Sequence, residues 1–306
     1  MSAVLDLVDQ IVGEVASEAA TAEIAAWIGA VSFAVIVASL LADRFRPAES
    51  LARTTGRRAV RAAAVFAMFV ELGVQVRSSG WLTGMDAATL DWFTTHRSSG
   101  MTTITRAVTT AGNPAGLAVI GLLLAAVLAR RLRSMAPMVL ILGIVAVASA
   151  ASTISKVVIG RNRPPTAVQL MTETDFSYPS GHVTGTAALA GAALLVYLGS
   201  RPTSSRGIVA VVSTVVVVAV VAVTRLYLGV HWLTDVIGGG LLGCSVVLIG
   251  AIVRPYLQSA LRRRPADTPS KGGLGTIEHD TPMNRMCPPS TASREAEHNE
   301  PNPAIR

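Results

Sequence analysis

Seven uninterrupted apolar stretches constrain the fold of this chain more than any other feature of its sequence. Each can cross roughly 30 Å of hydrocarbon as an α-helix, which satisfies its own backbone hydrogen bonds in lipid. Hydrophobic residues make up 51% of the 306 residues and charged residues 15%, which excludes an ordinary water-soluble domain. We therefore predict an all-α, polytopic transmembrane helical bundle, with spans at residues 24–42, 60–76, 114–129, 136–157, 182–199, 207–223 and 233–253.

The first two spans need separate arguments. A secretory signal begins with basic residues, whereas residues 1–23 carry five acidic side chains, so the first stretch is predicted to be a retained span. The second stretch is the weakest, because it is short, opens with Arg61 and contains Glu71. We interpret Glu71 as a structural hydrogen-bonding or helix-packing group rather than a functional one.

Arginines in the short connections predict the orientation in the membrane, because cytoplasmic loops collect Lys and Arg. With seven spans, the basic connections 43–61, 130–133 and 201–206 and the segment after residue 261 all fall on one side. The prediction is an integral protein of the plasma membrane, with its amino terminus outside and its carboxyl terminus in the cytoplasm. Segments 77–113, 158–181 and 224–232 then face outward.

Two segments outside the spans have distinctive compositions. The stretch 85–97, MDAATLDWFTTHR, is typical of an amphipathic helix at the membrane interface, and we interpret it as an anchor. Residues 258–306 are predicted to form a disordered cytoplasmic tail, since Pro, Ser, Thr, Asn and charged residues replace the apolar periodicity.

The net charge of +7 does not indicate nucleic-acid binding, because it comes from arginines that follow the membrane topology. Lysine occurs only at Lys156 and Lys271. Cys244 and Cys287 have no spacing typical of a metal site or a disulfide.

Ionisable residues that do not fit a plain membrane bundle occur in three clusters. In KVVIGRNRPP, Lys156 closes the fourth span and Arg161 and Arg163 follow, with Pro164 predicted to end the helix. Taken alone, Lys156 could equally be a snorkelling cation at the interface.

The second cluster, FSYPSGHVTGTAAL, opens the fifth span. Ser180 and Gly181 form a turn before the helix whose exposed N–H groups suit an anion, and His182 lies in the first turn. In isolation, Ser180 would more often be a simple helix cap and His182 a surface histidine.

The third cluster, TRLYLGVHWLTD, contains Arg225, His231 and Asp235. Four residues of spacing would put His231 and Asp235 on one helix face, where the carboxylate fixes the imidazole tautomer and increases its nucleophilicity. The alternative is that Asp235 only favours the start of its helix.

The predicted topology places all three clusters at one membrane face, so three cations, two histidines and one aspartate meet. Lys156, Arg163 and Arg225 would repel a divalent metal, so no metal site is predicted. A serine hydrolase would need a GxSxG context, which is missing, and would leave the cations unexplained. Phosphoryl transfer uses every residue of the set.

Lys156-x6-Arg163-Pro164, Pro179-Ser180-Gly181-His182 and Arg225-x5-His231-x3-Asp235 together resemble the three-part signature of the type 2 phosphatidic acid phosphatase (PAP2) superfamily. The similarity extends over roughly residues 60–255. One departure is Thr224, where the family usually has serine. The other is the first span, 24–42, which is additional to the six-helix core of the family.

The resemblance implies a metal-independent membrane lipid phosphatase without cofactor, acting on a lipid phosphate or polyprenyl diphosphate at the extracytoplasmic face. It implies that His231 attacks phosphorus to form a phosphohistidine, that Asp235 orients His231, and that His182 protonates the leaving oxygen. The implied phosphate-binding residues are Lys156, Arg163, Arg225, Ser180 and Gly181. The implied domains are residues 1–59 with the extra helix and a basic cytoplasmic loop, a catalytic membrane domain at 60–257, and the tail.

Two other functions remain open from the sequence. A lipid phosphotransferase would use the same phosphohistidine with an acceptor other than water. An anion or lipid transporter could use intramembrane cations, although these charges cluster at one rim rather than at the midplane. The vanadium-dependent haloperoxidase branch of the family shares the anion pocket but is soluble. The sequence does not identify the lipid or the oligomeric state.

Overall fold

A computed structural model describes residues 2–45, 50–199 and 203–262. Within these ranges the chain contains α-helices, two short 3-10 helices and no strand, which confirms the all-α prediction. The α-helices are α1 (Ser2–Phe45), α2 (Leu51–Arg77), α3 (Gly84–Thr95), α4 (Ser99–Ala111), α5 (Pro114–Arg131), α6 (Ala136–Ile159), α7 (Gly181–Leu198), α8 (Ser204–Tyr227) and α9 (Leu233–Arg262). The 3-10 helices are Trp81–Thr83 and Thr166–Val168.

Seven of these helices are long and apolar enough to cross a membrane: α1, α2, α5, α6, α7, α8 and α9. Each contains one of the predicted spans, except that the span 182–199 runs one residue beyond the end of α7. The weak second span forms the carboxyl-terminal part of α2. Exposed valines and isoleucines along α8, such as Ile208, Val209 and Val215, suit contact with lipid chains.

Helix α9 extends beyond the predicted end of the membrane domain. It continues to Arg262, so residues 258–262, which the sequence assigned to a disordered tail, are helical. Good helix formers in this stretch, Gln258, Ala260 and Leu261, explain the extension. The remainder of the predicted tail lies outside the described residues.

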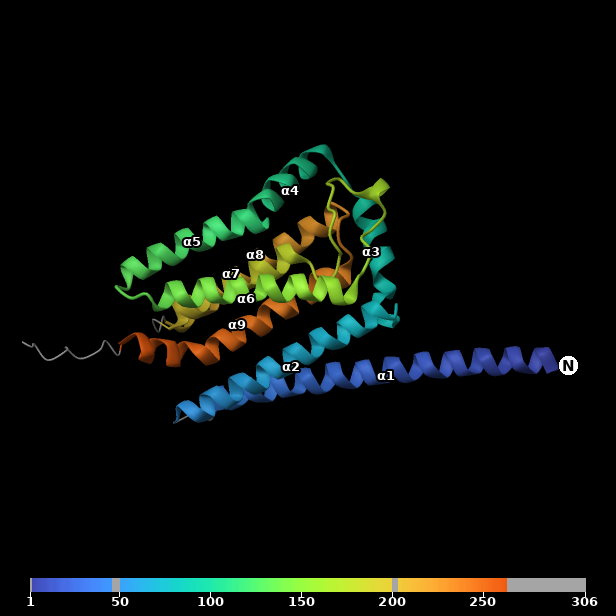
Figure 1. The fold of residues 1–306 in the computed structure, drawn as a ribbon, viewed down its shortest axis with the longest axis horizontal. Helices are drawn as coiled ribbons and strands as arrows, with labels where there is room; N and C mark the ends of the chain where they lie inside the picture. The colour runs from blue at the N-terminus through green and yellow to red at the C-terminus, as the bar shows by residue number, and fades with distance from the viewer. Residues whose placement is uncertain (1, 46–49, 200–202, 263–306) are drawn as a thin grey trace, which may run out of the picture. The chain divides into compact units, whose positions relative to one another are not determined.

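Two helices lie between the spans α2 and α5. The amphipathic stretch forms α3, which runs across the ends of the longer helices (Figure 1). Helix α4 was not predicted, because its threonine-rich sequence has a low helix propensity. It forms because the Ser98 side chain caps its first turn and because Thr105 and Thr109 are buried.

The core of the bundle lies between α5, α6, α7 and α9. Its buried side chains are Leu117, Ala125, Leu140, Ile141, Ile144, Ala148, Ala188, Leu189, Ala192, Val196 and Val246. Small residues let α7 and α9 approach closely: a Cβ added at Gly243 would lie 2.6 Å from the Ala187 Cβ. This packing brings the end of α6 and the starts of α7 and α9 together.

The extra helix α1 packs against α2. Asp43 of α1 forms ion pairs with Arg57 and Arg61 of α2. Within α2, the Gln75 amide donates a hydrogen bond of 3.1 Å to Glu71, which is the kind of structural contact predicted for that carboxylate.

Candidate active site

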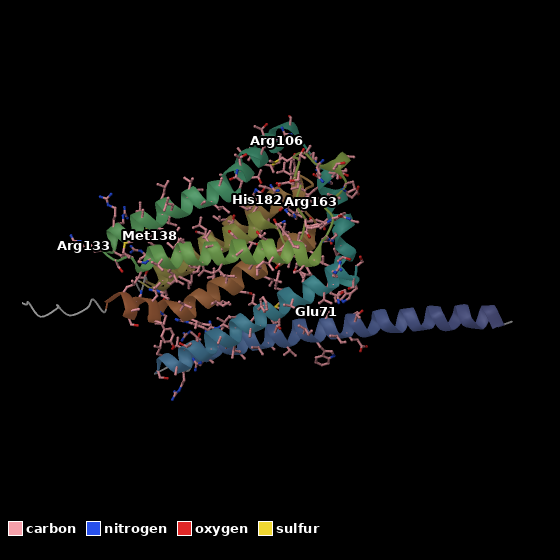
Figure 2. The ribbon with its side chains drawn as sticks, in the orientation of Figure 1. Glu71, Arg106, Arg133, Met138, Arg163 and His182 are labelled. Atoms are coloured by element: carbon pink, nitrogen blue, oxygen red, sulfur yellow. The ribbon has the colours of Figure 1, made fainter. Side chains whose placement is uncertain are left out.

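The three sequence clusters meet at one end of the helical bundle. His182 and Arg163 lie at the end that carries α3 and α4, whereas Arg133 lies at the opposite end (Figure 2). A cavity of about 740 Å³ opens between the clusters. The predicted site residues that line it are Lys156, Arg163, Gly181, His182 and His231.

The first cluster begins in the last turn of α6. Helix α6 ends because Gly160 adopts a left-handed conformation with φ of +65°, which a glycine tolerates without strain. The prediction that Pro164 ends this helix was therefore wrong. The ammonium group of Lys156 donates to the Phe176 carbonyl and lies 3.1 Å from a carboxylate oxygen of Asp175.

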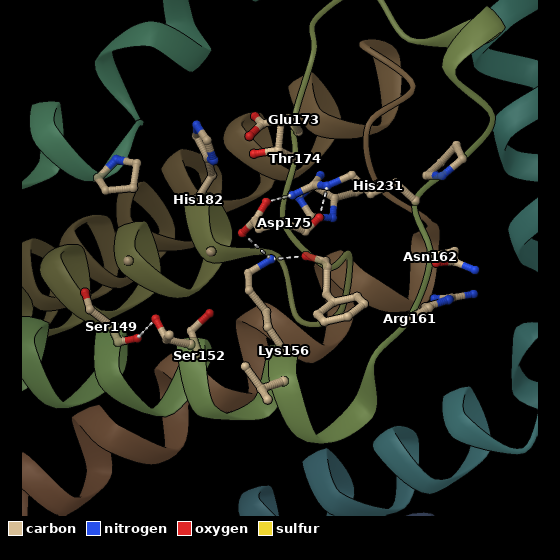
Figure 3. A pocket seen from close by; sticks show the side chains of 18 of the residues that line it. Ser149, Ser152, Lys156, Arg161, Asn162, Glu173, Thr174, Asp175, His182 and His231 are labelled. Carbon is tan, nitrogen blue, oxygen red and sulfur yellow. Dashed lines mark hydrogen bonds and ion pairs between the residues drawn. The ribbon is translucent and has the colours of Figure 1, made fainter.

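Arg163 connects the loop before α7 with the third cluster. Its guanidinium donates to the Asp175 carboxylate at 2.5 Å and to the Val230 carbonyl at 2.7 Å. The same group lies 3.2 Å from His231 Nε2. Figure 3 shows Lys156, Asp175 and His231 converging on the cavity from α6, the loop and the segment before α9.

The second cluster forms the start of α7. Ser180 occupies the N-cap position, as predicted, but its hydroxyl does not cap the helix and has no hydrogen-bond partner among the described residues. Its backbone N–H donates to the Asp235 carbonyl at 3.0 Å. Gly239 permits this approach, since a Cβ there would lie 2.8 Å from the Ser180 carbonyl oxygen.

The third cluster spans two helices. Arg225 lies in the last turn of α8 and is fully buried, where it donates to Thr109 at 2.6 Å and pairs with Glu173. Its guanidinium lies 3.4 Å from His182 Nε2. Arg225 therefore lies behind Glu173 rather than on the open wall of the cavity.

His231 and Asp235 form the predicted hydrogen-bonded pair, but they do so in a turn and not on one face of a helix. Helix α9 begins at Leu233, so His231 precedes the helix instead of sharing a face of it. The turn nevertheless brings His231 Nδ1 to 3.2 Å from Asp235 Oδ2. The same oxygen accepts the Trp232 backbone N–H at 2.8 Å, which fixes the turn.

A comparison with protein families matches residues 137–259 to the PAP2 superfamily. This match covers less than half of the chain. All three clusters lie within the matched residues.

The fold of the chain is similar to that of a solved protein. The crystal structure of a transmembrane PAP2-type phosphatidylglycerolphosphate phosphatase from Bacillus subtilis superposes with a TM-score of 0.57 at 22% identity. The match covers 66% of this chain and 98% of that chain. A search of curated protein sequences finds no match.

The electrostatics of the site favour a neutral His231. Burial lowers the pKa of His231 to about 4, although the hydrogen bond and charge of Asp235 act in the opposite direction. With Asp235 accepting at Nδ1, the hydrogen-bond network assigns the ring proton to that nitrogen. The lone pair of Nε2 then points towards Arg163 and the cavity.

Sequence reasoning missed two carboxylates in the loop before α7. Asp175 pairs with Lys156 and Arg163, and Glu173 pairs with Arg225, so this one loop binds all three predicted phosphate-binding cations. Burial opposes ionisation of Asp175 and Glu173, but the paired cations outweigh it and hold the pKa of each carboxyl below its usual value. The acidic sequence TETD between two basic clusters was the available signal.

Three polar atoms around the site have no hydrogen-bond partner within the described residues: Ser152 Oγ, Ser180 Oγ and Arg225 Nε. Ser152 lines the cavity one turn before Lys156. Buried polar atoms are rarely left unpaired, so these groups are suited to a polar ligand. In the part of the chain that the structure describes, no three His, Cys, Asp or Glu residues gather as a metal site requires.

Proposed function

We propose that this protein is an integral membrane lipid phosphatase, which hydrolyses a lipid phosphate or polyprenyl diphosphate through a phosphohistidine at the extracytoplasmic face. The observation that carries the proposal is the position of His231. Its Nε2 faces a cavity lined by Lys156 and Arg163, and its Nδ1 is held by a buried carboxylate. The match of residues 137–259 to the PAP2 superfamily supports this proposal.

Binding begins with an exchange of anions. The phosphate of the substrate replaces Asp175 on Lys156 and Arg163, and its oxygens accept hydrogen bonds from these cations. The N–H groups at the start of α7 contribute further donors. These groups neutralise the charge on the oxygens as the phosphoryl group is transferred.

In the first chemical step, the lone pair of His231 Nε2 attacks phosphorus while the bond from phosphorus to the leaving oxygen breaks. His182 donates the proton that this oxygen needs, and Asp235 stabilises the positive charge that develops on the imidazole. In the second step, a water molecule gives its proton to His182 and attacks the phosphohistidine. The nitrogen–phosphorus bond breaks, and inorganic phosphate leaves.

The walls of the cavity support a lipid as the substrate. Along α6 the lining runs from Lys156 down to Val145, a distance of about 16 Å at the rise of an α-helix. Pro114 and Leu117 of α5 form the facing wall. Between Lys156 and Val145 the α6 lining consists of Thr153, Ser152 and Ser149. The apolar contacts for the first part of a hydrocarbon chain therefore come from Val145, Pro114 and Leu117.

The arginine distribution supports an extracytoplasmic site. The ends of α5 and α6 that carry Arg130, Arg131 and Arg133 lie opposite the cavity, and such basic connections favour the cytoplasm. The proposal is testable in intact cells with a membrane-impermeant maleimide. Cys287 should be protected from it, whereas a cysteine introduced at the exposed Ser99 should react; the reverse pattern would overturn the orientation.

Purified protein in detergent provides the test of activity. We expect phosphate release from at least one of phosphatidylglycerol phosphate, diacylglycerol phosphate and polyprenyl diphosphate, and we expect it to survive a chelator. His231→Ala should abolish release, whereas His96→Ala, an exposed histidine on the same side of the bundle, should retain it. Release that persists in His231→Ala would overturn the mechanism.

Two further measurements separate the alternatives. Transfer of labelled phosphate to an added alcohol at the expense of water would identify a phosphotransferase. Anion flux into liposomes that persists in His231→Ala, without phosphate release from any of the lipids, would identify a transporter.

A further inference from the structure

Asp86, in the first turn of α3, lies outside the residues that match the PAP2 superfamily and reaches into the structure around His231. It is only 4% exposed. One carboxylate oxygen accepts the Thr234 backbone N–H at 2.9 Å. The other accepts the Thr234 hydroxyl at 2.7 Å and a guanidinium N–H of Arg161 at 2.5 Å. Asp86 therefore holds both Arg161 and the start of α9.

Arg161 links Asp86 to Asp235, the partner of His231. Its second terminal nitrogen donates to Asp235 Oδ1 at 2.7 Å and to the Thr234 hydroxyl at 2.6 Å. The guanidinium lies over the ring of Trp232, with its central carbon 5.4 Å from the ring centroid. Arg161 lines the cavity, but two carboxylates occupy its guanidinium.

The two oxygens of Asp235 have separate partners. Among the described residues, Oδ1 accepts a hydrogen bond only from Arg161, whereas Oδ2 accepts from His231, from the Trp232 backbone and from the Ser177 hydroxyl. A carboxylate held at Oδ1 cannot rotate about its terminal bond, so Oδ2 stays directed at His231 Nδ1. The chain of contacts runs from α3 through Arg161 and Asp235 to the nucleophile.

We propose that Asp86 and Arg161 are positioning residues, which fix the carboxylate of Asp235 and through it the tautomer and direction of the His231 ring. This inference rests on the proposed function for its kinetic consequences. It also gives α3 a second role besides the anchoring predicted from its amphipathic sequence, because the helix contributes a buried carboxylate to the site.

Charge balance explains why two carboxylates surround one guanidinium. Arg161 alone with Asp235 would form a neutral pair, and the imidazole would lose the negative charge that supports it. Because Asp86 also binds Arg161, the two carboxylates and the one guanidinium together retain one net negative charge beside His231. That charge stabilises the positive ring that forms when Nε2 attacks phosphorus.

The test compares Asp86→Asn, Arg161→Gln and the double variant with Asp91→Asn, which removes an exposed carboxylate from the same helix α3. Small displacements of a catalytic group cost up to about 100-fold in rate. We expect Asp86→Asn and Arg161→Gln each to lower kcat by about 10- to 100-fold. We expect KM and the inhibition constant of inorganic phosphate to stay within about twofold, because the phosphate-binding cations are untouched.

The two single effects should not add, because both variants break the same chain of contacts. The kcat of the double variant should lie within about threefold of the kcat of the slower single variant. The kcat of Asp91→Asn should equal that of the wild type. An unchanged kcat in Asp86→Asn would overturn the proposal. So would a loss in which the phosphate inhibition constant rises in parallel, since Arg161 would then bind the phosphate directly.

A second readout does not depend on turnover. In protein labelled with ¹⁵N-histidine, we expect the His231 signal, assigned by its loss in His231→Gln, to report a proton on Nδ1 in the wild type. Asp86→Asn and Arg161→Gln should each produce a mixture of tautomers, whereas Asp91→Asn should not. If no lipid phosphate is hydrolysed, the proposed function fails, and this measurement still decides the positioning role: an unchanged signal in both variants would refute it.

Discussion

The two ends of the helical bundle use cationic side chains in opposite ways. At the end of α5 and beyond it, Arg130, Arg131 and Arg133 are exposed. At the other end, the side chains of Arg163 and Arg225 are 8% and 0% exposed, and each pairs with a carboxylate. An exposed ion pair contributes little to stability, whereas a buried cation costs several kcal/mol unless it is paired.

This difference shows that burial and partners, rather than residue type, distinguish the roles of the arginines. The exposed arginines need only lie on the correct side of a membrane. The buried cations require a loop that supplies carboxylates, and in the proposed mechanism Asp175 must leave Lys156 and Arg163 before a phosphate can bind.

The largest expected difference is in activity. Arg163→Gln should lower kcat/KM by about 100- to 1,000-fold, which is the usual effect of removing one donor from a developing anion. Arg133→Gln should leave activity within about twofold. The two variants are measured side by side on the most active lipid phosphate. Equal losses would show that the comparison between the two ends is wrong.

The next difference is in stability. Glu173→Gln leaves Arg225 without its charged partner in the interior, so the free energy of unfolding should fall by about 2 kcal/mol. Arg130→Gln should change it by less than about 0.5 kcal/mol. Unfolding in mixed detergent micelles provides the measurement. A stable Glu173→Gln protein would mean that Arg225 does not depend on this loop.

The pH dependence sharpens the account of His231. Burial lowers its pKa to about 4, so the neutral, nucleophilic ring persists as the pH falls from 7 to 5 and is lost as the pH passes through 4. Because the folded pKa lies below the ordinary value, this group reduces stability progressively as the pH falls from 6.5 towards 4. The rate of phosphoenzyme formation, measured in single turnovers, should fall on the acidic side near pH 4. A fall near pH 6.5 would contradict the buried environment of His231.

The smallest effect concerns Asp175, whose side chain is about half exposed. Asp175→Asn removes a carboxylate that competes with phosphate for Lys156 and Arg163. Because solvent screens this partly exposed pair, the gain should be below about 1 kcal/mol. Inorganic phosphate should therefore inhibit the variant about threefold more strongly, while Asp91→Asn serves as the control. Weaker inhibition would show that Asp175 holds the cations in place instead of competing with the ligand.

The sequence predicted the spans because apolar length is a local property. It also predicted the convergence of Lys156, His182 and His231, since alternating spans place their segments at one end of the bundle. The structure confirms that these residues share a cavity. Their chemical roles remain predictions.

Several of the remaining features depend on contacts between distant residues, and the sequence does not specify which residues pair. The contact between Asp86 and Thr234 joins residues 148 positions apart. The pairing of Glu173 with Arg225 depends on how the loop folds over the end of α8. The end of α6, in contrast, is determined locally. Gly160 adopts a left-handed conformation and ends the helix before the chain reaches Pro164.

Trapping the covalent intermediate is the decisive measurement for the proposed mechanism. In His182→Ala the group proposed to activate water is missing, so a substrate carrying labelled phosphate should leave the label on the protein. The account predicts an adduct that is labile in acid and stable in base, and that maps by mass spectrometry to the peptide containing His231. A label on Ser180 or on another residue, or hydrolysis by His231→Ala, would contradict it.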